Sequence, residues 1–341
     1  MSRALETLDA DVLGPYLEQH VAGFEGLQQI DKFADGQSNP TFRVSADSGE
    51  YVLRRQPPGK LLKSAHAVDR EYRVLAALAD SDVPVATVYH LCEDRDVIGS
   101  MFYIMEFCDG RILWDPAIPE VDKAERTAMY DEMNRVLARL HQVDVEAVGL
   151  ADFGKPGNYF ERQYERWNSQ YRASELQPIP AMDRLIDALA EMLPEDDGRV
   201  SLVHGDYRLD NMIFAKDSPT VIALLDWELS TLGHPFADIG YHCMQLRMPA
   251  EIGSIRGLRG RNLDELGIPN EQDYVATYCN RMGIQRINNF GFYVAFSFFR
   301  LAAIVQGVAK RAVDGNASNR KAAEMGQYVE PLAGLALEAI A

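Results

Sequence analysis

The chain has 341 residues, 47% of them hydrophobic and 25% charged, so it is long enough to bury one large core or two smaller ones. Its 34 basic and 51 acidic residues give a formal net charge of −17. Because nucleic acids and anionic membranes both favour basic surfaces, this charge argues against either of them as a general partner.

The first hundred residues predict a small antiparallel sheet with one main helix. Apolar and polar residues alternate there as in strands, and a turn at residues 47–50 predicts a hairpin. Val74, Leu75 and Leu78 supply the apolar face of a helix over residues 66–78. One strand is expected to end near residue 33, and the others to span residues 41–44, 51–54, 87–91 and 101–107.

From about residue 115 the apolar residues recur at helical spacing. The only strand-like interruption is expected within residues 211–226. The apolar run from Phe290 to Val308 carries Arg300 and Gln306, so we interpret it as a buried helix rather than a membrane span, which needs about 20 largely uncharged residues. Helices are expected over residues 119–141, 159–172, 182–193, 271–282, 288–311 and 320–340.

This pattern predicts an α+β protein of two lobes. The N-lobe would comprise residues 1–108, followed by a connector at 109–114 and a larger, mostly helical C-lobe at 115–341. Small ligands commonly bind between lobes, so we expect the functional site there.

The cysteines and the start of the chain predict a cytoplasmic location. Cys92, Cys108, Cys243 and Cys279 form no C-x-x-C pair, which favours reduced thiols over a disulfide framework or a zinc site. Residues 1–20 lack the basic start and apolar run of a secretory signal.

The strongest motif is the stretch VHGDYRLDN that ends at Asn211, with Asp226 following fifteen residues later. Phosphoryl transfer needs metal ions that neutralise the phosphates and a carboxylate that accepts the proton of the attacking hydroxyl. In an H-x-D-x-x-x-x-N loop, Asp206 would face the hydroxyl while Asn211 reaches a metal, and Asp226 would complete a Mg²⁺ site. The alternative is a plain turn in which Asp206 only caps a helix.

The segment HGDYRLDNMIF at residues 204–214, together with LDWE at 225–228, resembles the aminoglycoside phosphotransferase (choline kinase-like) family. The resemblance extends from about Phe33 to Ala339. It implies a bilobal fold related to protein kinases, ATP as phosphoryl donor and Mg²⁺ as cofactor. Shorter strings resemble, more narrowly, the kinase domain found fused to acyl-CoA dehydrogenases; they lie at residues 52–55, 64–73, 162–167, 230–235 and 299–304.

The resemblance assigns roles to individual residues of the C-lobe. It implies that Asp206 is the catalytic base and that Asn211 and Asp226 bind Mg²⁺. Asp238 would support the catalytic loop by accepting backbone hydrogen bonds, and His204 would orient the same loop.

In the N-lobe, a strand residue of such kinases holds the α- and β-phosphates and pairs with a helix glutamate. These positions fall at Arg54 and Glu71. Most relatives of the protein-kinase type have lysine at the first position, and arginine differs from lysine in its planar, bidentate geometry. Arg55 competes for the role, but alternation along the strand favours Arg54.

The remaining nucleotide contacts are expected from a loop and from the connector. Gly36 and Ser38 lie in the loop at residues 35–41 that would cover the phosphates, a weak motif with a single glycine. Glu106 and Cys108 would bond the adenine edge through their backbone. Both ATP and GTP remain open as donors.

The acceptor is expected to be the hydroxyl of a small molecule. Residues 281–321 contain seven basic side chains against Asp314 alone, which suits an anionic substrate. The alternative is a solvated helix surface with scattered ion pairs. Together with the resemblance, the charge suggests a hydroxyacyl-CoA or a hydroxy acid, whose phosphate would be a good leaving group for later elimination.

Three alternatives to a hydroxyacyl kinase are compatible with parts of the sequence. Within the family, the acceptor would instead be an aminoglycoside or macrolide antibiotic, or the chain would be an inactive, nucleotide-binding pseudokinase. A metal-dependent hydrolase does not account for Asn211, Arg54 or Glu71. Its two-metal centre would use His204, Asp206, Asp226, His234 and His242. The sequence carries no signal of an oligomeric state.

Overall fold

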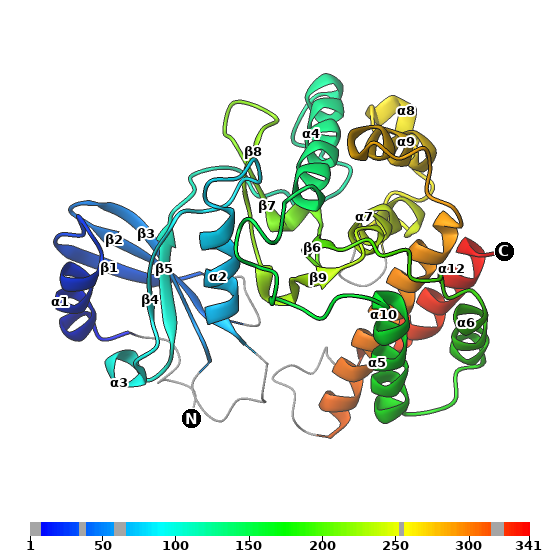
Figure 1. Ribbon diagram of the computed structural model, residues 1–341, viewed down its shortest axis with the longest axis horizontal. Helices are drawn as coiled ribbons and strands as arrows, with labels where there is room; N and C mark the ends of the chain where they lie inside the picture. Colours follow the sequence, from blue (N-terminus) through cyan, green and yellow to red (C-terminus); the bar gives the residue numbers. More distant parts are fainter. Residues whose placement is uncertain (1–7, 34–38, 58–65, 252–255, 315–323) are drawn as a thin grey trace.

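A computed structural model describes residues 8–33, 39–57, 66–251, 256–314 and 324–341. A β-rich N-terminal lobe lies beside a larger helical lobe (Figure 1). This arrangement agrees with the predicted α+β, bilobal, protein-kinase-like fold.

The N-terminal lobe contains a five-stranded antiparallel sheet in the order β1-β2-β3-β5-β4. The predicted hairpin is present, and it pairs Phe42 with Leu53 and Thr41 with Arg54 across β2 and β3. The strands are β1 (Leu27–Lys32), β2 (Thr41–Ala46), β3 (Gly49–Arg55), β4 (Val88–Cys92) and β5 (Phe102–Glu106).

Alternation along the strands gives the sheet two buried faces. Phe42 and Leu53 pack against Leu13 and Leu17 of helix α1 (Ala10–His20). Val52 belongs to the main core of the protein, to which helix α2 (Val68–Leu78) also contributes. Because side chains two residues apart share a face, Arg54 points toward α2 with Val52, whereas Arg55 points the other way.

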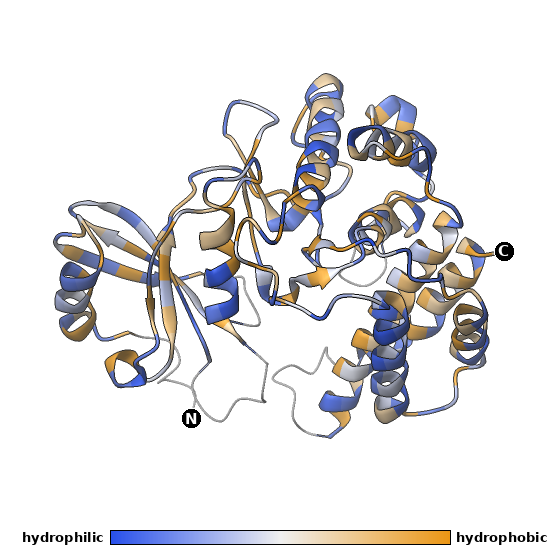
Figure 2. Cartoon of the chain, in the orientation of Figure 1, coloured by the Kyte–Doolittle hydropathy of each residue, from blue (hydrophilic) through white to orange (hydrophobic). Residues whose placement is uncertain are grey.

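The N-terminal lobe has a second sizeable helix, so the expectation of one main helix was incomplete. Helix α1 has 11 residues and begins at the N-cap Asp9, but it contains Pro15, which masks its helical pattern in the sequence. In Figure 2, α1 carries both hydrophilic and hydrophobic residues, as expected of a helix that buries one side. The short helix α3 (Arg95–Ile98) was also not predicted.

The helical lobe contains most of the predicted helices, together with α7 and α8, which were not predicted. Helix α7 begins after Pro235 and has polar residues and Gly240 among its apolar ones, so its periodicity is weak. The helices are α4 (Lys123–His141), α5 (Tyr159–Ser174), α6 (Pro180–Glu191), α7 (Phe236–Arg247), α8 (Leu263–Leu266), α9 (Glu271–Met282), α10 (Phe290–Val313) and α12 (Val329–Ala339).

The segment between α6 and α7 contains two two-stranded antiparallel sheets. The strand-like interruption at residues 211–226 is confirmed as β7 (Met212–Phe214) paired with β8 (Val221–Leu224). The prediction that it was the only one is wrong, because β6 (Ser201–Val203) pairs with β9 (Thr231–Gly233). Strands of three residues are too short to show a period in the sequence.

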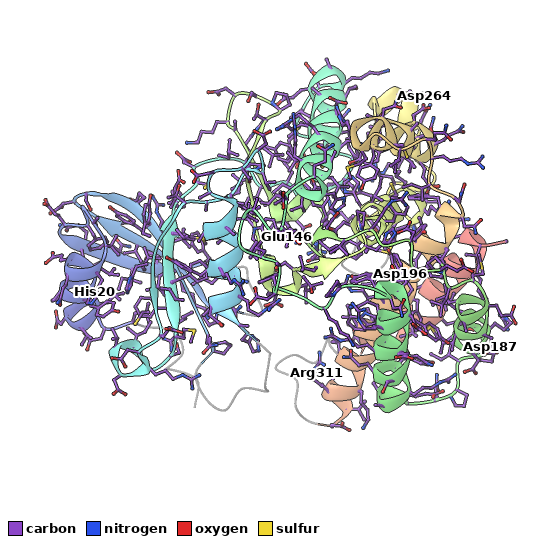
Figure 3. The ribbon with its side chains drawn as sticks, in the orientation of Figure 1. His20, Glu146, Asp187, Asp196, Asp264 and Arg311 are labelled. Atoms are coloured by element: carbon purple, nitrogen blue, oxygen red, sulfur yellow. The ribbon has the colours of Figure 1, made fainter. Side chains whose placement is uncertain are left out.

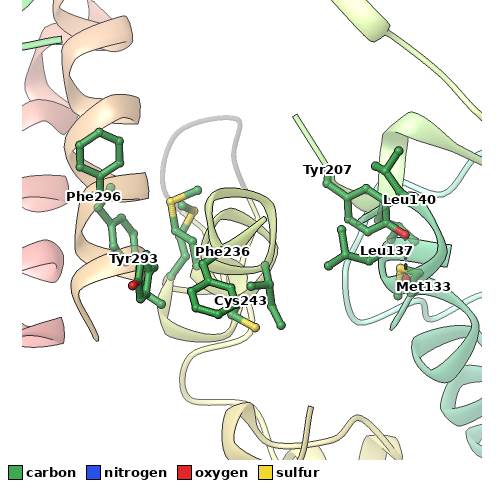
Figure 4. Close-up of a cluster of buried hydrophobic side chains, with 14 of the residues drawn as sticks. Met133, Leu137, Leu140, Tyr207, Phe236, Cys243, Tyr293 and Phe296 are labelled. Carbon is green, nitrogen blue, oxygen red and sulfur yellow. Dashed lines mark hydrogen bonds between the residues drawn. The ribbon is translucent and has the colours of Figure 1, made fainter. Parts of the chain in front are cut away.

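Helix α10 forms the centre of the helical lobe and packs against α5, α7 and α12. Figure 4 shows Tyr293 and Phe296 of α10 close to Phe236 and Cys243 of α7. By length and composition α10 is apolar enough to cross a membrane, but 72% of its most apolar window is buried inside the protein. That degree of burial is typical of a core helix, as the sequence predicted.

Candidate active site

The predicted catalytic loop lies between β6 and β7. Both carboxylate oxygens of Asp206 in this loop accept hydrogen bonds. The hydroxyl of Tyr241 on α7 donates to Oδ1 at 2.6 Å, and Asn211 Nδ2 donates to Oδ2 at 2.9 Å. Arg208 Nε lies 3.6 Å from Oδ2. The Asp206 carboxylate is therefore oriented by two different elements before any ligand arrives.

Backbone pairing brings Asp226 next to Asn211. The N–H of Leu225 donates to the carbonyl of Asn211 at 2.8 Å, and His204 Nε2 donates to the carbonyl of Leu225 at 2.9 Å. Asp226 itself has φ of +63°, a left-handed conformation that is uncommon for residues other than glycine and that occurs often at functional sites. Its side chain is 36% exposed, so the carboxylate is accessible to a ligand.

Asp238 of α7 fixes the start of the catalytic loop. Its carboxylate accepts the backbone N–H groups of His204 at 2.7 Å and Gly205 at 2.8 Å. It also contacts His141 Nε2 of α4 at 3.2 Å. Although burial opposes ionisation, the hydrogen bond from His141 and the charges of both histidines lower the pKa of Asp238. The carboxylate has the contacts that the sequence predicted.

Gly205 has no room for a side chain. Its φ is +83°, and a Cβ would lie 2.7 Å from the carbonyl oxygen of Leu229. This glycine lets the catalytic loop approach the segment after Asp226 closely.

In the N-terminal lobe, Arg54 joins Glu71 to Asp226. Its Nε lies 2.8 Å from Glu71 Oε2, and its Nη2 lies 2.6 Å from Asp226 Oδ1. Arg55 instead donates to Ser100 Oγ at 3.0 Å. Of the two candidates left open by the sequence, Arg54 is therefore the one that faces the catalytic loop.

Glu71 is buried among polar partners. Asn39 Nδ2 donates to its Oε1 at 2.8 Å, and the hydroxyl of Tyr103 donates to Oε2 at 3.3 Å. Burial raises the pKa of Glu71 to about 7, because the attraction of Arg54 is offset by the carboxylates of Asp226 and Glu228.

The other predicted nucleotide contacts involve the connector and the loop before β2. The N–H of Glu106 already donates to the carbonyl of Thr87 at 2.8 Å, so only other backbone groups of residues 106–108 can serve adenine. Cys108 is half-buried, and burial raises the pKa of its thiol to about 11. Gly36 and Ser38 lie outside the residues that the structure describes.

The two-metal hydrolase is not supported by the positions of its histidines. His234 lies 3.3 Å from Asp197, and His242 stacks on Tyr274 at a centroid distance of 5.0 Å, where burial lowers its pKa to about 4. Across the described ranges, no group of three or more His, Cys, Asp or Glu side chains is placed to hold a metal ion.

The donor set at the catalytic loop nevertheless fits magnesium. An amide oxygen of Asn211 and the accessible carboxylate of Asp226 are hard oxygen ligands on adjacent backbone segments. Mg²⁺ commonly uses one or two protein carboxylates, with phosphate oxygens and water at its other positions. The metal assignment of these two residues stays a prediction.

Several residues of this site were missed by sequence reasoning, among them Asn39, Tyr241 and His141. Asn39 is 1% exposed and also lies 3.4 Å from Glu228, Tyr241 contacts Asp206, and His141 contacts Asp238. Asn39 falls in the loop predicted to cover the phosphates, so its polarity just before a strand was a usable signal. Tyr241 and His141 lie on helices far from the motif in sequence and gave none.

The model of the phosphotransferase enzyme family matches residues 29–270, well over half of the chain. The chain belongs to the phosphotransferase enzyme family. The predicted resemblance is thereby confirmed at the level of the family.

A relative in mouse, acyl-CoA dehydrogenase family member 10, is 48% identical to this chain over 325 residues. The match covers 94% of this chain and 30% of the mouse protein. The chain thus spans less than a third of that relative's length.

Two solved structures share the fold of this chain. A Ralstonia eutropha protein, provisionally described as an aminoglycoside phosphotransferase, is 50% identical, with a TM-score of 0.89 over 98% of both chains. A spectinomycin phosphotransferase in complex with ADP and spectinomycin is 13% identical, with a TM-score of 0.66 over 98% of this chain and 99% of that one. The second likeness establishes the fold alone.

Proposed function

We propose that the protein is a kinase that transfers a phosphoryl group from Mg²⁺-bound ATP to the hydroxyl of a small molecule. The observation that carries the proposal is the pair of contacts made by Arg54, which ties Glu71 and Asp226 together beside the catalytic loop. The same arrangement of a cation, a helix carboxylate and a metal-binding aspartate grips nucleotide in protein kinases.

The side chains of the loop have distinct roles in this reaction. Asp206 orients the acceptor hydroxyl and accepts its proton as the new O–P bond forms and the bond to ADP breaks. Asn211 and Asp226 would hold Mg²⁺, which supplies neutralisation of the phosphate charge. Arg54 binds phosphate oxygens, and Asp238 keeps the loop in register through the two backbone N–H groups it accepts.

The acceptor we favour is a hydroxyacyl-CoA or a related hydroxy acid. The mouse relative carries acyl-CoA dehydrogenase in its name, and the chain corresponds to only a part of it. Phosphorylation of a hydroxyacyl chain gives a phosphate ester, whose phosphate can leave in a later elimination that forms a carbon–carbon double bond. The substrate of this kinase would thus be supplied as a hydroxylated thioester and its product consumed by an elimination.

The test is a coupled assay of ADP release by the purified protein with Mg²⁺ and ATP. We expect turnover with a 4-hydroxyacyl-CoA and only background release with kanamycin, with a macrolide, and with the acyl-CoA that lacks the hydroxyl. Kanamycin or macrolide phosphorylation without turnover of the hydroxyacyl thioester would contradict the proposed acceptor. Nucleotide binding without transfer to any acceptor would instead identify a pseudokinase.

A further inference from the structure

Several basic residues of the C-terminal lobe form ion pairs near the surface. Arg281 pairs with Asp131 at 2.8 Å, Arg259 with Glu338 at 2.8 Å, Arg256 with Asp115 at 2.9 Å and Lys310 with Asp314 at 2.5 Å. Arg320 and Lys321 lie outside the described residues. The alternative that the sequence left open, a solvated helix surface with scattered ion pairs, therefore accounts for Arg281 and Lys310, whereas Arg256 and Arg259 form their ion pairs from the segment before α8.

Arg300 on α10 behaves differently. No carboxylate of the described residues lies within ion-pair distance of it, and its Nε is a buried donor without a hydrogen-bond partner in that part of the chain. A buried, unsatisfied donor costs about 1–3 kcal/mol, so such a group calls for an explanation, and a bound ligand that supplies the missing acceptor is one.

The guanidinium of Arg300 lies near two aromatic rings. Its central carbon is 5.5 Å from the ring centroid of Trp167 on α5 and 5.6 Å from that of Tyr241 on α7. Aromatic faces attract a cation and restrict its orientation, which leaves the edge of the guanidinium for an oxygen ligand.

Arg300 is also close to the proposed base. The hydroxyl of Tyr241 contacts Asp206, so a single tyrosine side chain separates the guanidinium from that carboxylate. Close packing of the helices sets this spacing, because a Cβ on Gly240 of α7 would lie 2.7 Å from the carbonyl oxygen of Tyr293 on α10.

We propose that Arg300 binds an acyl oxygen of the acceptor, a carboxylate or a thioester carbonyl, that lies a few bonds from the hydroxyl undergoing phosphorylation. The inference rests on the proposed function and deepens it, since it names the residue that selects acyl-bearing acceptors. The same cation repels positively charged amino sugars, so Arg300 also discriminates against aminoglycosides.

The test compares Arg300→Met, which keeps an apolar stem, with Arg300→Lys, which keeps the charge. We expect Arg300→Met to raise KM for the hydroxyacyl acceptor at least about 10-fold, the scale of a hydrogen bond to a charged group. KM for ATP and acceptor-independent ATP hydrolysis should stay unchanged, and Arg300→Lys should lose less. Arg311→Met is a matched control, because Arg311 is exposed near the end of the same helix (Figure 3).

Two further arms separate the possible failures. A simple alcohol that lacks the acyl oxygen should be phosphorylated equally by wild type and Arg300→Met, and equal losses with both acceptors would overturn the role of Arg300. Calorimetric binding of an acyl-CoA without the hydroxyl, and of the corresponding free carboxylate, reports on Arg300 without any transfer. Binding lost in Arg300→Met supports the site even if no phosphorylation is seen, and binding equal to wild type refutes it.

Discussion

Replacing Asp206 by asparagine is expected to lower kcat at least about 10²-fold, the usual contribution of a positioned general base. The amide keeps the shape of the carboxylate, and with its oxygen toward Asn211 and its NH₂ toward the Tyr241 hydroxyl it satisfies both present neighbours. The fold and the binding of nucleotide should therefore persist, so that KM for ATP changes little. The measurement is steady-state ADP release at saturating acceptor, with circular dichroism as a check of folding.

A matched control is Asp217→Asn, an exposed acid in the turn between β7 and β8. It removes the same charge a short distance along the chain and should leave kcat unchanged. Wild-type kcat in Asp206→Asn would show that the role of Asp206 is wrong, even with the fold correct.

Replacing Asp226 by asparagine is expected to abolish the effect of Mg²⁺ on nucleotide binding. Asparagine tolerates the left-handed φ of +63° at this position, so the backbone should be kept. Loss of the anionic metal ligand should lower kcat/KM for ATP by at least about 10²-fold, since even loss of a residue behind a metal ligand commonly costs 10–100-fold in affinity.

Thermal unfolding separates this loss from a loss of stability. Wild type should gain in Tm when Mg²⁺ and ATP are added together, because a ligand that binds only the folded state stabilises it, whereas Asp226→Asn should not. Without ligand the variant loses the ion pair between Asp226 and Arg54, whose side chains are 36% and 13% exposed, so each protein's Tm with Mg²⁺ and ATP is compared with its own Tm without them. A Mg²⁺-dependent gain as large as in wild type would rule out Asp226 as a metal ligand.

Much of the site could be predicted because its chemistry is concentrated in short segments. Asp206 and Asn211 lie in one loop, and Asp226 follows a strand that must pair with the strand after Asn211. The choice of Arg54 over Arg55 required only the two-residue period of a strand and the position of a helix glutamate.

What could not be predicted depends on contacts between distant segments. Tyr241 reaches Asp206 from α7, and although Gly240 of α7 permits close packing on α10, the local sequence does not indicate which segments α7 contacts. The three-residue strands β6 and β9 form by pairing with each other across a long sequence separation. Each is too short to show an alternation of apolar and polar residues in the sequence. The N–H of Glu106 donates to the carbonyl of Thr87, a pairing that the sequence did not indicate, and the contact of Glu106 and Cys108 with adenine stays a prediction.

The two contacts of Arg54 affect how the protein would bind nucleotide. One planar guanidinium uses separate nitrogens for Glu71 and Asp226, which the single ammonium of a lysine cannot do in the same way. Before nucleotide arrives, the side chain thus acts as an internal counter-ion for two acids. On the proposed function, entry of nucleotide would be an exchange of partners, in which phosphate oxygens would take over part of the contacts of Arg54 and the Asp226 carboxylate would be released to hold Mg²⁺.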